Sequence, residues 1–273
     1  MGAQIVTNGS FNQVPADGLV PGARAEVEFF PVFAANQEAV LIAPRLSTGT
    51  LADGEFQYLS GNGGQARELF GAGSIGERMA KAFRRANQTQ PLIVIALDDE
   101  GTGVEASTTR AITGTATTAA QMRIYVGRQA GVVGVDIGDT ASVGGDAIVT
   151  AVTAGDEDGE SLPVTASNST GTVTFTCRHM GEMGNEIEID LGTIPAGLSH
   201  TAPASLTMTS GAGNASHAGG IAALSAADPA YIVTPHTDDP NMDRWDTEMS
   251  DRWGPLRQQY GLVFSARRGT LNE

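Results

Sequence analysis

The stretch that most constrains the fold is residues 71–100, which reads as a helix, a short turn and a buried strand. Ser74 can cap the helix, with Glu77 three residues on: the hydroxyl accepts from the Glu77 amide, and the carboxylate reaches back to the cap amide. Pro91 ends any helical continuation, and Leu92–Leu97 is an apolar run too short for a helix. Such a run is typical of a strand that is covered on both faces of a parallel sheet.

The predicted helix has an apolar face and a charged face. Apolar residues recur at helical spacing, at Ile75, Met79, Ala82, Phe83 and Ala86. Charged residues fall largely on the other side, at Glu77, Arg78, Lys81, Arg84 and Arg85. We therefore expect the apolar face to be buried on the sheet.

Three glycines at the start of this unit match the GxGxxG pattern of dinucleotide-binding sites. They are Gly71, Gly73 and Gly76, and Asp98 follows about 20 residues further on. The fingerprint needs a strand that runs directly into the first glycine, yet residues 65–70 read as a short helical turn, and the third glycine lies inside the capped helix. We therefore expect no cofactor at this turn. A nucleotide-dependent α/β enzyme that uses the turn is the alternative interpretation.

Composition and charge exclude several classes of protein. The chain has 273 residues, 41% of them hydrophobic, which can supply a sizeable core. Its net charge of −15 argues against a nucleic-acid binder, whose affinity rests on neutralising phosphates, and against an anionic membrane surface. Cys177 is the one cysteine, so no intrachain disulfide can form, which fits a reducing compartment. Residues 1–10 lack a signal-peptide pattern, and no run approaches the roughly 20 apolar residues of a membrane span.

The order of the segments predicts an α/β fold. We expect an open, mostly parallel sheet with flanking helices, interrupted by an inserted β-rich (α+β) domain. The predicted parts are an extended N-terminal arm (1–22), the first part of the α/β body (23–102), the inserted domain (103–211) and the second part of the body (212–273). The chain stops just as a further helix would begin, so we expect the sheet to be truncated.

Shorter patterns place the elements within these parts. In the body, we expect strands at residues 23–30, 40–43, 56–60, 231–234 and 262–266, with 56–60 pairing beside 40–43. In the inserted domain, we expect strands at residues 122–126, 132–137, 172–177 and 186–191, and a helix at 140–153.

The C-terminal part is expected to add two helices, one at residues 216–226 and one from an Asp239 N-cap and Pro240 to about residue 254. The second helix carries a stripe of large apolar residues, which we interpret as core: Met242, Trp245, Met249 and Trp253. The two strands on either side of the insertion, Leu92–Leu97 and residues 231–234, should be neighbours in the sheet.

Several longer motifs follow one another in a distinctive order. They are LVPGARAEVEF (19–29), LFGAGSIGERMAKAFRRANQ (69–88), RHMGEMGNEIEIDL (178–191), YIVTPHTD (231–238) and DRWGPLRQQYG (251–261). In these motifs and their order, the chain resembles the tail sheath proteins of contractile-tailed bacteriophages, most closely those of Mu-like phages. The resemblance runs almost from end to end.

The resemblance implies an α/β body with an outward β-rich insertion, followed by a C-terminal domain that is absent here. It also implies a structural protein and not an enzyme. Copies would polymerise around the tail tube, contact tube and baseplate proteins, and contract to drive the tube through the host envelope. Such a subunit belongs to the virion tail, is assembled in the host bacterial cytoplasm, and neither binds nucleic acid nor inserts into a membrane. Without the C-terminal domain, the chain should stay monomeric or associate weakly.

Residues that could carry catalysis do not form a recognisable set. A Ser/His/Asp triad has four histidines to draw on, but no serine lies in a GxSxG turn. The histidines are His179, His200, His217 and His236. We therefore expect no catalytic residues, and a cell-surface binding module in the inserted domain remains a third interpretation.

Possible metal ligands occur in three places, and we expect none of them to bind metal. His236, Asp238 and Asp239 lie at a strand end, where turn and N-cap roles explain the aspartates. Cys177 and His179 alternate onto one strand face, two ligands short of a structural zinc site. The acidic run 156–160 lacks the later glutamate of a calcium loop, so it reads as a solvated turn.

Overall fold

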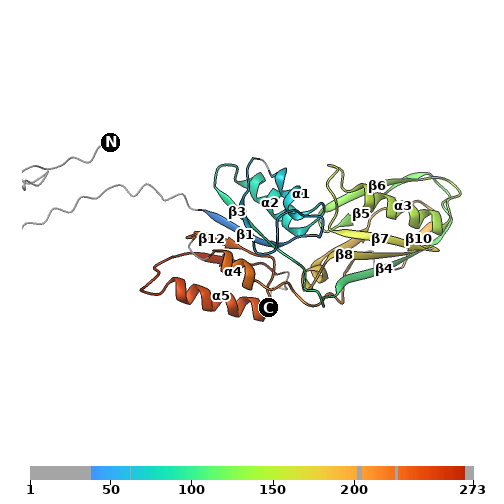
Figure 1. Cartoon of the computed structure of the whole chain (residues 1–273). Helices are drawn as coiled ribbons and strands as arrows, with labels where there is room; N and C mark the ends of the chain where they lie inside the picture. The colour runs from blue at the N-terminus through green and yellow to red at the C-terminus, as the bar shows by residue number, and fades with distance from the viewer. Residues whose placement is uncertain (1–37, 62, 202–204, 225–226, 268–273) are drawn as a thin grey trace, which may run out of the picture. The chain divides into compact units, whose positions relative to one another are not determined.

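A five-stranded mixed sheet joins two distant stretches of the chain, residues 39–97 and 231–264 (Figure 1). The computed structural model describes residues 38–61, 63–201, 205–224 and 227–267. The strand order is β13-β12-β1-β3-β2, with β1 Ala39–Pro44, β2 Phe56–Tyr58, β3 Leu92–Leu97, β12 Tyr231–Val233 and β13 Leu262–Phe264. β1 pairs in parallel with both β3 and β12, β12 pairs in parallel with β13, and β2 pairs antiparallel with β3. The predicted arm (1–22) and the strand at 23–30 lie outside the described residues.

The strands β1 and β3 are buried on both faces, as the apolar run predicted. Alternate residues of each strand enter two separate cores. Leu41 and Val94 pack with α1 (Gln65–Phe70) and α2 (Ile75–Ala86) on one face. Ile42 and Ile95 pack with α4 (Ala218–Leu224) and α5 (Asp239–Arg252) on the other. Because full burial of each large side chain contributes about 1.5–3 kcal/mol, helices on both faces are what hold this strand pair in place.

Two expected strand neighbours are wrong. β12 does not pair with β3, because β1 lies between them and pairs with both. β2 pairs with β3 and not with β1. Both edges of β1 are occupied by parallel partners, β3 on one side and β12 on the other. β2 therefore pairs with the outer edge of β3.

The buried face of α2 also differs from the prediction. Ala82 and Ala86 are exposed, whereas Gly76 and Ala80 are buried and the larger Met79 and Phe83 are half-buried. Small residues face the neighbouring helix because the two helices approach closely. A Cβ added at Gly76 would lie only 2.3 Å from Cδ1 of the buried Phe70 ring.

Two charged residues of α2 are buried as well, each with partners. Arg84 donates from Nη1 and Nη2 to the carbonyls of Gln90 and Leu59, and its stem fills apolar space beneath the sheet edge. Glu77 accepts from Gly73 N at 2.7 Å and forms an ion pair with Lys81 at 2.7 Å. Helical periodicity could not foresee this burial because it counts charged residues as exposed.

Residues 105–207 form two four-stranded antiparallel sheets around a core of their own. One sheet has the order β10-β4-β8-β7, with β4 Glu105–Gly114, β7 Val164–Ser169, β8 Thr172–Met180 and β10 Leu198–His200. The other has the order β11-β9-β5-β6, with β5 Ala120–Val126, β6 Gln129–Val135, β9 Glu188–Leu191 and β11 Ser205–Thr207. The helix α3 (Ala141–Ala154) packs against β6 and β7, and a 3-10 turn (Glu182–Glu186) precedes β9.

The predicted strands at residues 122–126, 132–137, 172–177 and 186–191 correspond to β5, β6, β8 and β9, and the predicted helix corresponds to α3. The sequence analysis missed β4 and β7, whose Ser- and Thr-rich sequences alternate buried and exposed positions with few large apolar residues. α3 keeps its glycines because Gly145 lies against Asn168, where a Cβ would come within 2.5 Å of Oδ1.

The chain enters and leaves this segment at one point. Val104 bridges to Ala212, and Ser107 bridges to Thr209. At Gly213 (φ 78°), an added Cβ would lie 2.8 Å from the Cα of Gly103, so the two chain segments touch backbone to backbone. The glycine-rich junctions of the sequence therefore lie side by side.

The C-terminal helix α5 begins one residue earlier than expected. Its N-cap is Asp238, whose Oδ2 accepts from Asn241 N at 3.3 Å, so Asp239 is already helical. Of the apolar stripe, Trp245 is 2% exposed, whereas Trp253 at the end of the helix is 51% exposed. Across the part of the chain that the structure describes, no helix has the length and apolar character to cross a membrane.

The predicted cap of α2 is present, with one change. Ser74 Oγ accepts from Glu77 N at 3.0 Å, and the helix begins at Ile75. The Glu77 carboxylate does not return to Ser74 N but bonds to Gly73 N, while Ser74 N donates to the carbonyl of Gly71. Because the turn before the helix already uses the Ser74 amide, the Glu77 carboxylate bonds to the amide of the preceding residue, Gly73.

Removing this cap should lower stability. Ser74→Ala loses the acceptor for a buried amide, and we expect a loss of about 1 kcal/mol in the free energy of unfolding. Urea unfolding monitored by circular dichroism measures it. Ser250→Ala is the matched control, because Ser250 is exposed within α5 and its loss should change stability by less than about 0.5 kcal/mol. Equal midpoints for Ser74→Ala and wild type would contradict the prediction.

Candidate functional site

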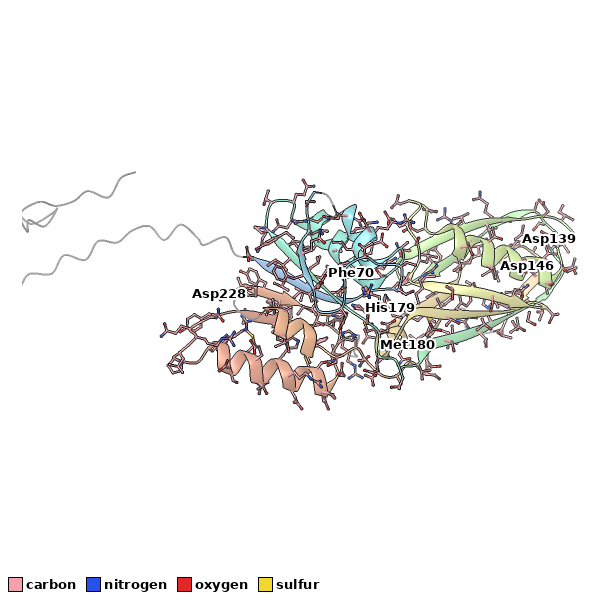
Figure 2. All side chains as sticks on the ribbon, viewed as in Figure 1. Phe70, Asp139, Asp146, His179, Met180 and Asp228 are labelled. Carbon is pink, nitrogen blue, oxygen red and sulfur yellow. The ribbon has the colours of Figure 1, made fainter. Side chains whose placement is uncertain are left out.

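The N-terminus of α2 meets β8 through a buried histidine. This residue is His179, which is labelled in Figure 2. His179 Nε2 accepts from Ile75 N at 3.1 Å, and His179 Nδ1 lies 3.1 and 3.2 Å from the two carboxylate oxygens of Asp99. Because Nε2 is an acceptor, the ring proton of the neutral histidine must be on Nδ1, from which it donates to Asp99. Asp99 also accepts from Met180 N at 3.2 Å. This link ties the end of β3, β8 and α2 together.

The GxGxxG glycines serve close packing. Gly71 and Gly73 have φ of 85° and 81°, which glycine adopts without strain. An added Cβ at Gly73 would lie 2.7 Å from the carbonyl oxygen of Leu162 and 3.0 Å from Nε of Arg178. Gly76 makes the contact with Phe70 described above. Each glycine therefore has a packing reason that involves no ligand.

Four of the amides around this turn are already hydrogen-bonded within the protein. Gly73 N is bonded to Glu77, Ser74 N to the carbonyl of Gly71, Ile75 N to His179 and Glu77 N to Ser74. A helix, α1, precedes the turn where the dinucleotide fingerprint requires a strand. Asp98, the candidate ribose ligand, forms an ion pair with Arg45 at 2.7 Å. The absence of a cofactor stays a prediction, and this geometry supports it.

Nucleotide binding can be tested directly. We expect no change in melting temperature with millimolar NAD or ATP, because a ligand that binds the folded state at concentrations well above its Kd would raise the stability. Differential scanning fluorimetry measures this. A rise with either nucleotide that Ala72→Asp abolishes would contradict the prediction, since an added carboxylate in the turn repels phosphate.

A second buried polar cluster joins α4, α5 and β12. Trp245 Nε1 donates to His217 Nδ1 at 2.8 Å, so the proton of neutral His217 must be on Nε2. That nitrogen lies 2.9 Å from His236 Nδ1 and 3.2 Å from Thr234 Oγ1. His236 Nδ1 therefore accepts, which leaves the His236 proton on Nε2. The indole of Trp245 thus fixes the tautomers of both histidines.

This tautomer bears on the candidate metal site at His236, Asp238 and Asp239. His236 Nε2 carries a proton and cannot ligate a metal, and Asp238 accepts from Asn241 as the cap of α5. Among the described residues, no group of three or more His, Cys, Asp or Glu is arranged to hold a metal ion. The N-cap role of Asp238 and the hydrogen bonds of His236 both support the prediction that this place binds no metal.

The other two candidate metal sites also have structural explanations. Burial raises the pKa of the Cys177 thiol to about 11, and both ring nitrogens of His179 are engaged as described. In the acidic run 156–160, Asp156 Oδ1 accepts from the amides of Asp158 and Glu160, as in a turn. Glu160 forms an ion pair with Lys81.

The structure brings only some of the predicted chemical residues together. His217 and His236 are in contact, and Thr234 provides the nearby hydroxyl, but no described serine bonds to either ring. His179 belongs to the separate link with Asp99, and His200 lies on β10. The sequence analysis missed the Asp99 partner of His179. The alternation of β8, which buries His179, was the signal that a partner must exist.

The buried histidines predict a pH dependence of stability. Burial lowers the pKa of His217 to about 3 and that of His236 to about 4, and for His217 the neighbouring His236 adds to the effect. Below pH 6.5 these two histidines bind protons in the unfolded chain but stay neutral in the folded chain. Stability should therefore fall as pH decreases from 6.5 to about 4, by up to about 1.4 kcal/mol per pH unit for each histidine.

Urea unfolding at a series of pH values measures this slope. His236→Gln should flatten the slope between pH 6.5 and 4.5, because one of the two groups no longer titrates. His200→Gln, which changes a half-buried histidine outside the cluster, is the control and should keep the wild-type slope. An unchanged slope in His236→Gln would show that this cluster does not govern the acid side of the stability curve.

The chain is similar to a known protein along nearly its whole length. No family model matches the chain. The tail sheath protein of the Mu-like prophage FluMu of Haemophilus influenzae is 33% identical over 97% of this chain, and the chain spans 54% of that relative. The crystal structure of a sheath tail protein from Desulfitobacterium hafniense gives a TM-score of 0.34 at 13% identity, covering 89% of this chain and 52% of the other, too distant to bear on the argument. The chain is therefore similar over nearly its whole length to a tail sheath protein of a Mu-like prophage, and it spans about half the length of that relative.

Proposed function

We propose that this chain is part of a structural subunit of a contractile phage tail. Copies polymerise into a sheath around the tail tube, contact tube and baseplate proteins, and contract to drive the tube through the host envelope. The observation that carries the proposal is the 33% identity over 97% of the chain to a tail sheath protein. The subunit is then a component of the virion tail, assembled in the host cytoplasm, without nucleic-acid binding or membrane insertion.

We infer further that the protein is not an enzyme. The support is physical: the α2 amides are bonded within the protein, and the two histidines that touch each other are buried with Trp245. Such arrangements use these polar groups to stabilise the fold. Neither the nucleotide-dependent enzyme nor the surface-binding module gains support from a described contact.

The domain organisation is part of the same proposal. The body, residues 23–102 and 212–273, is an open, mostly parallel sheet with flanking helices, interrupted by the β-rich domain 103–211. Three observations support it: the core of residues 106–208 is separate from the two cores of the five-stranded sheet, the strands described in this segment pair only with one another, and its entry and exit touch. The N-terminal arm, 1–22, lies outside the described residues.

The segment 103–211 should fold by itself. Expressed alone, it should give dispersed amide signals in proton–nitrogen NMR spectra and a cooperative melt, because its core comes from its own residues. Ile148→Asp, which places a charge at a fully buried core position, is the control and should abolish both. A collapsed, non-cooperative spectrum for the unmodified segment would mean that the contacts of His179 with Ile75 and Asp99 are needed for folding.

Negative-stain electron microscopy tests the function. The sample is a chimera in which this chain replaces the matching part of the Haemophilus relative, compared with the unmodified relative. We expect both to form tubes with regular striation, because a sheath subunit must repeat its contacts along the tube. Striated tubes of the relative beside a dispersed chimera would refute the proposal.

A further inference from the structure

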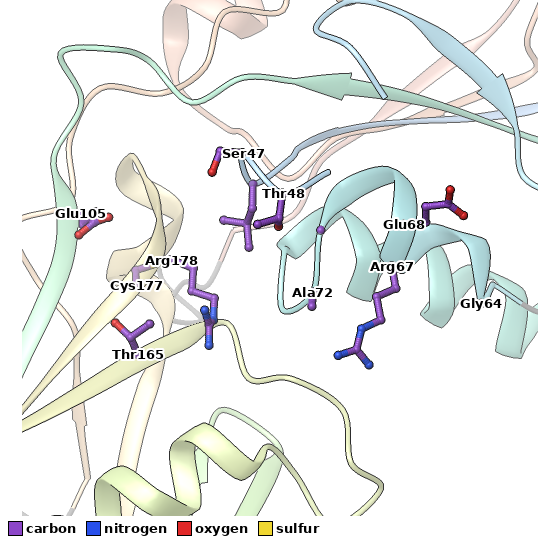
Figure 3. Close-up of a pocket in the computed structure, with 12 residues that line it drawn as sticks. Ser47, Thr48, Gly64, Arg67, Glu68, Ala72, Glu105, Thr165, Cys177 and Arg178 are labelled. Carbon is purple, nitrogen blue, oxygen red and sulfur yellow. The ribbon is translucent and has the colours of Figure 1, made fainter. Parts of the chain in front are cut away.

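A cleft of about 810 Å³ lies between α1 and the strands β7 and β8 (Figure 3). Arg67 of α1 and Arg178 of β8 line it, together with Thr48 and Thr165. Figure 3 shows the two guanidinium groups extending toward the same side of the cleft. Two guanidinium groups in one cleft, together with the hydroxyls of its threonines, favour an oxyanion as the ligand.

Arg178 is fixed at one end and open at the other. Its Nε donates to the carbonyl of Leu162 at 2.8 Å, and its stem lies against Gly73. Neither terminal nitrogen has a hydrogen-bond or ion-pair partner within the described ranges. Both Nη groups are therefore available for a bidentate contact with one carboxylate.

Two glutamates, Glu68 and Glu105, also line the cleft. Neither forms an ion pair with Arg67 or Arg178 in the described part of the chain. Figure 3 shows Glu68 directed away from both arginines and Glu105 at the end of the cleft opposite Arg67. The side chain of Arg67 makes one contact, 3.5 Å from Nη2 to Ser161 Oγ, so its charge is also open to a partner.

The chain carries the complementary charge on α5. Asp239, Asp243 and Asp246 follow helical spacing on the solvent face, and none has an ion-pair partner among the residues that the structure describes. We name these three the α5 acidic row. The adjacent Arg244 does not neutralise the row by direct contact, since its Nη1 donates to the carbonyl of Pro240 at 2.8 Å.

The cleft and the α5 acidic row lie on opposite faces of the five-stranded sheet. α1 packs on the face that Leu41 and Val94 enter, and α5 packs on the face that Ile42 and Ile95 enter (Figure 1). One copy therefore cannot fill its own cleft with its own acidic row. A second copy can, and the pairing leaves a free cleft at one end and a free row at the other. Contacts of this head-to-tail type repeat and build open polymers.

We infer that the Arg67–Arg178 cleft binds a carboxylate of the α5 acidic row from a second copy of this chain. The inference rests on the proposed function, for which it names one contact between subunits. It also has a physical ground in the net charge of −15: like-charged copies repel each other unless their few cations meet carboxylates. A single contact of this kind supports weak, reversible association.

Sedimentation velocity at rising protein concentration tests the contact. The wild-type chain should show an average mass that increases with concentration. Arg67→Gln with Arg178→Gln breaks the cleft, Asp243→Asn with Asp246→Asn breaks the row, and each variant should associate roughly fivefold more weakly. Arg67→Gln alone, which changes an exposed side chain, should act in the same direction and guards against misfolding of the double variant. Arg85→Gln and Glu55→Gln change exposed charges elsewhere and should associate like wild type.

Mixing the two broken variants gives the sharpest result. The intact cleft of one variant can still take the intact row of the other, so the mixture should form a complex of two copies that grows no further. No association of the wild type, equal association of all variants, or no complex in the mixture would each overturn the inference. The Haemophilus chimera separates the two proposals. If it forms striated tubes as readily with Arg67→Gln and Arg178→Gln as without them, the inferred contact is refuted and the proposed sheath function is not.

Discussion

The parallel pairing of β1 with β3 is the constraint on which the rest of the structure depends. Six residues of each strand pair in register, and all of them are buried. A strand pair that is apolar on both faces must be covered twice, so α1 and α2 close one face and α4 and α5 the other. The long excursion through residues 103–211 separates the elements that cover these two faces. The sheet is complete only when the chain returns from it.

Hydrogen bonds of His179 also tie the segment 103–211 to the five-stranded sheet and its helices. They join a donor at the start of α2 to a carboxylate just beyond β3 through a ring carried by β8. Because the ring is fully buried, loss of either partner would leave a polar atom unsatisfied, which costs about 1–3 kcal/mol. The orientation of the antiparallel sheets is thereby tied to the same helix whose cap and glycines shape the turn. One short stretch, residues 71–77, thus serves both halves of the described structure.

Sequence patterns predicted the elements well where a local rule decides them. The cap at Ser74, the strand Leu92–Leu97 and the helix α5 follow from side-chain chemistry over a few residues. The order of the strands could not be predicted this way, because β1 takes two partners that are far apart in sequence. The candidate site was predictable only as separate residues: tautomers, and the partner of His179, depend on contacts that periodicity does not contain. The burial of Glu77 and Arg84 was missed for the same reason, since Glu77 is stabilised by an amide and Arg84 by two carbonyls from outside the helix.

The touching glycines, Gly103 and Gly213, have a thermodynamic consequence for what the body can accommodate. The entropy of closing a loop depends on the logarithm of its length, so doubling the chain between two fixed ends costs only about 0.6 kcal/mol. The bridges at Val104 and Ser107 already hold the two ends of the segment together. The stability of the five-stranded sheet therefore depends little on the length of the segment between them. The length of that segment can therefore change during evolution at little cost to the stability of the five-stranded sheet.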